Sequence, residues 1–183
     1  FLPQLLIASV IARRPCKKPI IVRNAWRSRP IILLLALTIL LLGETAPKLA
    51  LGLTLGGLFV FFFFDAFVSV PWYDVLAKAL PESRRGRVLG TAQVIGGLAS
   101  IGAGAFIRYT LGSASPWGFP ANYALLFATG GTLFLVSATA LLFIDEGEPS
   151  DTENVPSAGT ILRSIPCLLS DDQHLRLLIV TRL

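Results

Sequence analysis

Five apolar runs, separated by short polar segments, dominate the pattern of hydrophobic and polar positions along the chain. Three of them cover about 49–70, 88–111 and 121–144, and each is long enough to cross about 30 Å of hydrocarbon as an α-helix. The run before these three, extended by its polar N-terminal flank, covers 26–43. The run at 1–12 is too short to span a membrane, so we expect it to be the end of a truncated span.

The runs are continuous, and their lack of a period-two alternation excludes membrane-spanning strands. We therefore predict an all-α, polytopic transmembrane helix bundle over residues 1–144, with four complete spans plus one truncated span. Residues 145–183 begin as an acidic stretch with Pro, Ser and Gly, which predicts a flexible linker followed by the start of another segment. Because the chain begins and ends within apolar sequence, we expect it to be a fragment of a longer protein.

Composition supports a membrane protein over a soluble one. Of 183 residues, 54% are apolar and 15% are charged, and the mean hydropathy is +0.70. Soluble domains contain about 25% charged residues. The net charge of +5 is concentrated between the apolar runs, a distribution that favours membrane orientation over nucleic-acid binding.

The distribution of Lys and Arg predicts which loops face the cytoplasm. The segments 13–29, 44–48, 72–87 and 112–120 contain 7, 1, 4 and 0 basic residues, respectively. This alternation places 13–29 and 72–87 on the cytoplasmic side. With four spans, the tail 145–183 also lies in the cytoplasm, and the membrane is expected to be the plasma (inner) membrane.

The residues that support covalent or metal chemistry are scarce. The chain has one histidine, His174, and two distant cysteines, Cys16 and Cys167, without metal-ligand spacing. We therefore expect no catalytic residues, no metal site and no cofactor. The expected partners are membrane lipid and an unidentified small-molecule substrate, with no nucleic acid.

An apolar run with Asp65, the segment "WYDVLAKALPESRRGRVLG" and a glycine-rich run follow one another. This order resembles the N-terminal half of the major facilitator superfamily of secondary transporters. The resemblance implies that the fragment runs from the end of the second helix to the linker after the sixth, and that a missing C-terminal half completes the transporter. Where the family has a basic motif between its second and third helices, this chain has Arg13, Arg14, Lys17 and Lys18 without the family's glycine and aspartate.

The basic loops have two interpretations. They can anchor to anionic headgroups and fix the orientation, with a helix stop at Pro81 and a turn at Gly86. They can also form a cytoplasmic gate, in which an arginine of "PESRRGR" pairs with Asp74 or Glu82 in one conformation and releases it in the other. The candidate gate residues are Arg13, Arg14, Lys17, Lys18, Asp74, Glu82, Arg84, Arg85, Gly86 and Arg87.

Asp65 is a carboxylate well inside an apolar run, where a charge costs about 2.5 kcal/mol or more. It is a candidate proton or cation coupling site, and the alternative is a structural carboxylate that reaches the nearby interface. Gln93 is a candidate for lining a pathway or for a hydrogen bond to a neighbouring helix. The run 88–111 is rich in small residues, which permit close helix contact in lipid. The candidate packing glycines are Gly90, Gly96, Gly97, Gly102 and Gly104.

We expect a non-enzymatic secondary active transporter that moves a small solute by alternating access. A non-transporting membrane scaffold or receptor is the alternative. A lipid-modifying membrane enzyme is a weaker one, because such an enzyme needs a carboxylate or histidine cluster at the membrane surface, and the acids at 145–153 have no nearby histidine.

Overall fold

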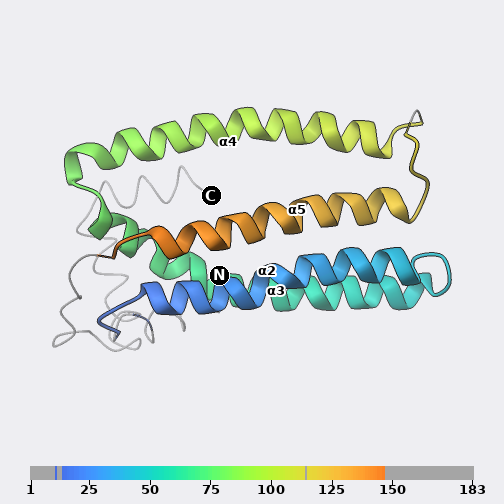
Figure 1. The fold of residues 1–183 in the computed structure, drawn as a ribbon, viewed down its shortest axis with the longest axis horizontal. Coiled ribbons are helices and arrows are strands. Elements are labelled where there is room, and N and C mark those ends of the chain that lie inside the picture. The colour runs from blue at the N-terminus through green and yellow to red at the C-terminus, as the bar shows by residue number, and fades with distance from the viewer. Residues whose placement is uncertain (1–10, 12–13, 114, 147–183) are drawn as a thin grey trace, which may run out of the picture. The chain divides into compact units, whose positions relative to one another are not determined.

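The computed structural model describes residues 11, 14–113 and 115–146. Most of the predicted truncated span at 1–12, the candidate Arg13 and the predicted linker from 147 onward therefore lie outside the described residues. Within the described part, the chain is all-helical and contains no strand (Figure 1). Its elements are α2 (Lys18–Leu42), α3 (Pro47–Ala79), α4 (Glu82–Leu111), α5 (Ala121–Ala140) and the short 3₁₀ helix η1 (Leu141–Phe143).

Proline marks the start of each of the four α-helices. Pro19 and Pro47 lie in the first turns of α2 and α3, and Pro81 and Pro120 are the N-caps of α4 and α5. The proline φ angle suits a helix start, where a missing N–H costs nothing because it would have no partner there. The turns between the apolar runs are therefore encoded locally.

The helices extend beyond the apolar runs. α2 begins eight residues before position 26, and α3 continues nine residues beyond position 70. α4 begins at Glu82, so the expected loop at 72–87 shrinks to a break at Leu80 and Pro81. The apolar run marks where a helix can cross hydrocarbon, whereas the helix itself continues into polar sequence until a residue such as Pro81 stops it.

Within the described residues, four helices are long and apolar enough to cross a membrane: α2, α3, α4 and the continuous stretch of α5 and η1. Their surfaces agree with this property, because many large apolar side chains are exposed on them. Phe59 and Ile101, for example, are exposed on α3 and α4.

α2 is the helix around which the described bundle is built, and it packs against both α3 and α5 (Figure 1). Its buried residues recur every three or four positions, which places them on one side of the helix. They are Ile21, Asn24, Ala25, Ser28, Arg29, Ile32, Leu35, Ala36 and Ile39.

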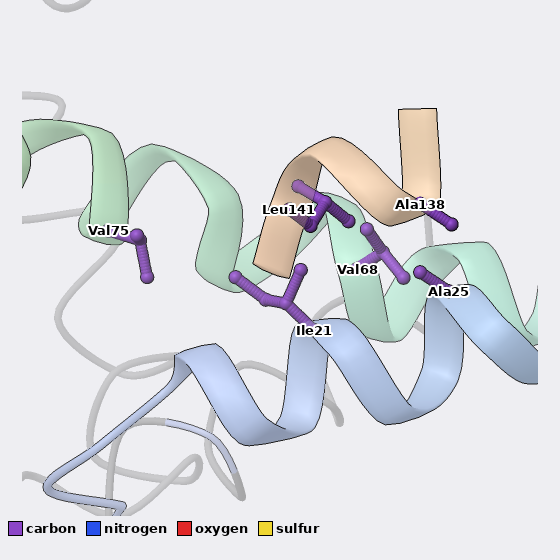
Figure 2. Close-up of a cluster of buried hydrophobic side chains, with 6 residues drawn as sticks. All are labelled: Ile21, Ala25, Val68, Val75, Ala138 and Leu141. Atoms are coloured by element: carbon purple, nitrogen blue, oxygen red, sulfur yellow. The ribbon is translucent and has the colours of Figure 1, made fainter. Parts of the chain in front are cut away.

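The buried apolar side chains form two clusters along this bundle. Figure 2 shows the first, to which α2, α3 and the end of α5 with η1 contribute Ile21, Ala25, Val68, Val75, Ala138 and Leu141. The second consists of Ile32 and Leu35 from α2 and Phe61 from α3, with Phe127 of α5 packed against it. The two clusters lie at successive levels along the same helices, separated by about two helical turns on α2 and α3.

α4 has a different environment. It is exposed along nearly its whole length, and Thr110 is its one buried residue among those described. A helix that is apolar all round and exposed has a surface suited to lipid or to another helix.

Candidate functional site

A buried ion pair joins α2 to α3 between the two apolar clusters. The Nη1 of Arg29 donates to the Oδ1 of Asp65 at 2.9 Å. The side chain of Arg29 is 9% exposed, and that of Asp65 is 30% exposed. The arginine is therefore deep in the bundle, while the carboxylate retains an open side.

The position of this pair follows from helix periodicity. On α2, Arg29 lies four residues after Ala25 and three before Ile32. On α3, Asp65 lies four residues after Phe61 and three before Val68. Since residues three and four apart share a helix face, both charged residues occupy the faces that the two apolar clusters use.

Two aromatic rings complete the surroundings of the guanidinium. The Cζ of Arg29 lies 4.7 Å from the ring centroid of Phe134 on α5 and 5.8 Å from that of Phe61 on α3. The two rings contact each other, with centroids 5.3 Å apart. Cation–π attraction of this kind contributes about 0.5–2 kcal/mol, and it grows as water is excluded.

One donor of the guanidinium has no partner in the described part of the chain. The Nε of Arg29 is buried and makes no hydrogen bond. A buried N–H without a partner costs about 1–3 kcal/mol, and more for a charged group. Such a donor therefore requires an explanation.

A second charged cluster lies at the end of the bundle where α2 begins. The carboxylate of Glu146 accepts hydrogen bonds from the backbone N–H groups of Lys17, at 2.6 Å, and Lys18, at 2.8 Å. Its Oε1 is 3.7 Å from the Nζ of Lys78 on α3. A carboxylate at a helix N-terminus satisfies otherwise unpaired N–H groups and suits the helix dipole. Glu146, expected at the start of a flexible linker, is instead buried and fixed to α2 and α3.

Lys17 links this cluster to a further acid, because its Nζ forms an ion pair with Asp74 of α3. Burial lowers the pKa of the Lys17 amine from its ordinary value of 10.5. The positive charge of Lys78 lowers this pKa further, and the negative charge of Glu146 opposes both effects. The cluster therefore joins α2, α3 and the residues after η1 through balanced charges.

The segment "PESRRGR" forms the first turns of α4. Arg85 pairs with Glu82 at 3.6 Å, three residues away on the same helix. Its Nε also donates to the carbonyl oxygen of Leu80 at 3.1 Å, and its Nη2 to that of Ala77. Arg85 thus satisfies carbonyl groups at the C-terminus of α3, as basic side chains there often do.

The other gate candidates are distributed differently from the expected latch. Asp74, expected to pair with an arginine of this segment, pairs with Lys17. Arg84 and Arg87 are exposed on α4, and Gly86 is inside the helix where a turn was expected. Arg14 lies just before α2. A gate role for these residues remains a prediction.

Gln93 and the candidate packing glycines all lie on the exposed length of α4. A Cβ added at any of these glycines would meet no atom within 4 Å. No described residue packs against these positions, so their role in helix packing stays a prediction. They are Gly90, Gly96, Gly97, Gly102 and Gly104.

Two other glycines make close helix contacts, and neither was singled out in the sequence. A Cβ at Gly57 of α3 would lie 2.5 Å from the Cδ2 of Leu35. A Cβ at Gly131 of α5 would lie 2.7 Å from the Cδ2 of Leu33 and 3.1 Å from its backbone nitrogen. α3 and α5 thus both approach α2 at a glycine, in the way small residues permit.

Arg29 is likewise a site residue that the sequence reasoning missed. It was counted with the basic loop 13–29, although α2 begins at Lys18. Its spacing from Ala25 and Ile32 was the available signal, because it continues the helix face of the apolar positions.

The remaining features of the described part offer little chemistry. No three His, Cys, Asp or Glu side chains among residues 11, 14–113 and 115–146 come together as a metal site. A pocket of about 230 Å³ near the α2–α3 turn is lined mainly by apolar residues, including Phe119, Tyr123 and Phe127. The Arg29–Asp65 pair is therefore the best candidate site.

Comparisons of the chain with protein-family models, with curated proteins and with solved structures found no significant match. The resemblance to the major facilitator superfamily thus rests on the order of the sequence features alone.

Proposed function

We propose that this protein is an integral membrane protein of the plasma (inner) membrane. In this proposal α2, α3, α4 and α5 with η1 span the bilayer, and the four long apolar helices support it. The part of segment 13–29 that precedes Arg29, the segment 72–87 and the tail 145–183 lie on the cytoplasmic side. α3 is about 50 Å long at 1.5 Å per residue, so its C-terminal turns with Asp74 and Lys78 extend beyond a hydrocarbon core of about 30 Å.

The proposed activity is secondary active transport of a small solute by alternating access, of the major facilitator type. The observation that carries this proposal is the ion pair between Arg29 and Asp65. Arg29 lies about 20 Å along α2 from Leu42. With Leu42 near the outer surface, the pair lies within the hydrocarbon core, where ionisable residues mark ion and substrate pathways.

The proposed mechanism uses the pair as a contact that forms and breaks. When Asp65 takes up a proton, it loses its charge, and the attraction that holds α3 to Arg29 of α2 weakens. α2 and α3 contain Pro30 and Pro71, respectively, each within about a turn and a half of the pair, and an internal proline removes a helix hydrogen bond there. The helices can therefore change their relative positions at this level without loss of regular hydrogen bonds elsewhere.

The charged cluster around Glu146 provides a second contact of this kind. It joins Lys17 and Lys18 at the start of α2 to Lys78 of α3 at the proposed cytoplasmic end. In this proposal, the ion pair of Asp74 with Lys17 closes the gate in place of a pair with an arginine of "PESRRGR". In the proposal, this cluster is formed in one state of the transport cycle and released in the other.

The missing C-terminal half is part of the proposal. The exposed glycines of α4 support it, because Gly90, Gly97 and Gly104 recur every seven residues and so share one side of the helix. A neighbouring helix of the other half can approach closely along that side.

The test is uptake by full-length protein reconstituted in proteoliposomes. A panel of small solutes is offered with and without an inward proton gradient, and the same panel is offered to the Asp65→Asn variant. We expect gradient-driven uptake of at least one solute by the wild-type protein and no dependence on the gradient in the variant. No uptake by folded protein would favour the scaffold or receptor function instead.

A further inference from the structure

The unpartnered Nε of Arg29 indicates what this site binds. Asp65 occupies the Nη1 corner of the guanidinium, which leaves the edge that carries Nε–H. This edge is one on which a guanidinium takes both oxygens of a carboxylate through two parallel N–H···O bonds. An anion there would satisfy the buried donor that the described residues leave without a partner.

The charges around the site restrict the anion to a single negative charge. The elements packed at this level are α2, α3 and α5. Along the three helices, Arg29 and Asp65 are the charged residues that lie between the two apolar clusters. α5 has no charged side chain. α2 and α3 have other charged residues, which do not belong to this pair. They are Lys18, Arg23, Arg27, Lys48, Asp74 and Lys78.

One cation cannot compensate a dianion in apolar surroundings, so a phosphate monoester or a dicarboxylate is disfavoured. The neighbouring side chains are rings and aliphatic groups, such as Phe61, Phe134 and Val68. They favour a carboxylate whose remainder is apolar and disfavour a sugar or another polar solute.

Charge balance also couples this anion to a proton. Arg29 with an ionised Asp65 is neutral, and a second carboxylate would leave a net negative charge in the bundle. If Asp65 takes one proton from solvent, the arginine, the incoming carboxylate and the neutral acid again sum to zero. The side chain of Asp65 is 30% exposed and that of Arg29 is 9% exposed, so Asp65 is the member of the pair that a proton can reach.

We propose that Arg29 is a binding site for an apolar monocarboxylate, which takes the place of ionised Asp65 at the guanidinium when Asp65 is protonated. In its transport aspect this inference rests on the proposed function, because it names the substrate class of that same site. The binding itself is independent of transport and is measured separately.

The test is equilibrium binding of radiolabelled benzoate to full-length protein in lipid nanodiscs. We expect saturable binding that is tighter in the Asp65→Asn variant than in the wild-type protein, since asparagine carries no competing charge. Benzamide, which has the same ring without a negative charge, is expected not to compete. No saturable binding by either the wild-type protein or the Asp65→Asn variant would overturn the proposal.

Three variants locate the site. Arg29→Lys keeps the charge and removes the Nε edge, so we expect the affinity for benzoate to fall by at least about tenfold. Arg27→Lys is the matched control, because Arg27 is an exposed arginine on the same helix, and binding should not change. Asp65→Asn should bind benzoate about tenfold more tightly than the wild-type protein, because asparagine leaves the guanidinium without a competing charge.

Circular dichroism and size-exclusion chromatography establish that each variant is folded. If Arg29→Lys does not fold, the comparison of Asp65→Asn with the wild-type protein decides. Binding by Arg29→Lys equal to wild type, or an Asp65→Asn protein that binds benzoate no more tightly than the wild type, would contradict the site. Benzoate binding without proton-driven uptake refutes the transport function alone, and uptake of another solute without benzoate binding refutes the carboxylate site alone.

Discussion

At the scale of single residues, the burial of Arg29 is the feature with the greatest energetic consequence. Its charge is compensated by one carboxylate and two aromatic rings. A buried ion pair contributes little net stability compared with apolar residues, but removing one partner leaves an uncompensated charge. The contribution of each of the two residues to stability should therefore depend strongly on the presence of the other.

This dependence predicts a non-additive double mutant. Arg29→Leu and Asp65→Leu should each lower the free energy of unfolding, by about 3 kcal/mol for the loss of Asp65, because Arg29 is then buried without a counter-ion. The double variant should be more stable than the Asp65→Leu single variant. Denaturant unfolding in detergent micelles measures this, and additive single effects would show that the pair is not coupled.

A glycine provides the second prediction at this scale. Gly131→Ala places a Cβ against the side chain and the backbone nitrogen of Leu33, so we expect a loss of about 1–3 kcal/mol of unfolding free energy. Gly130→Ala is the matched control on the same helix, since its Cβ would meet nothing within 4 Å. Alanine there should be neutral or stabilise the helix by up to about 1 kcal/mol. Equal effects of the two substitutions would contradict the close α2–α5 contact.

At the scale of elements, the ends of α2 and α3 are held by charges that influence one another. The lowered pKa of Lys17 means that the folded state holds this proton less tightly than the unfolded state. The charged amine destabilises the folded state. This cost in unfolding free energy is fully present below the lowered pKa, and it disappears as the pH rises from that value to 10.5. Stability from this group alone therefore rises with pH across that window.

Lys78→Gln tests this electrostatic cluster. Removing the positive charge of Lys78 should raise the pKa of Lys17, because the charge of Lys78 is one of the causes that lower it. The window in which stability rises with pH should narrow accordingly. NMR titration of isotope-labelled lysine amines measures the pKa directly. A Lys17 pKa that is unchanged or lower in the variant would place Lys78 outside the cluster.

The elements also show how far sequence reasoning reaches. The four apolar runs predicted the four long helices, because continuous apolar sequence of that length has few other solutions. Their ends were missed, since α2 and α3 continue through polar residues that no apolar pattern marks. The pairing of Arg29 with Asp65 was missed for the same reason, because Arg29 was placed in a loop. The packing glycines predicted on α4 stay a prediction, whereas the contacts of Gly57 and Gly131 were missed because neither lies in the glycine-rich run.

At the scale of the whole molecule, the proposed orientation can be tested by labelling single cysteines. In a background without the native cysteines, Thr45→Cys and Ser113→Cys should react with a membrane-impermeant maleimide added outside intact cells. Ser83→Cys, or native Cys16 restored alone, should react only after the membrane is opened. Thr45, Ser83, Ser113 and Cys16 are all exposed. External labelling of Ser83→Cys in intact cells would reverse the topology.

The central claim at this scale is that the Arg29–Asp65 pair couples a proton to the movement of a solute. The most direct measurement is uptake of a solute panel, benzoate included, into proteoliposomes that contain the full-length protein. We expect uptake that an inward proton gradient drives and that loses its gradient dependence in Asp65→Asn. An Asp65→Asn protein that keeps proton-driven uptake, or a folded wild-type protein that transports no solute, would contradict it.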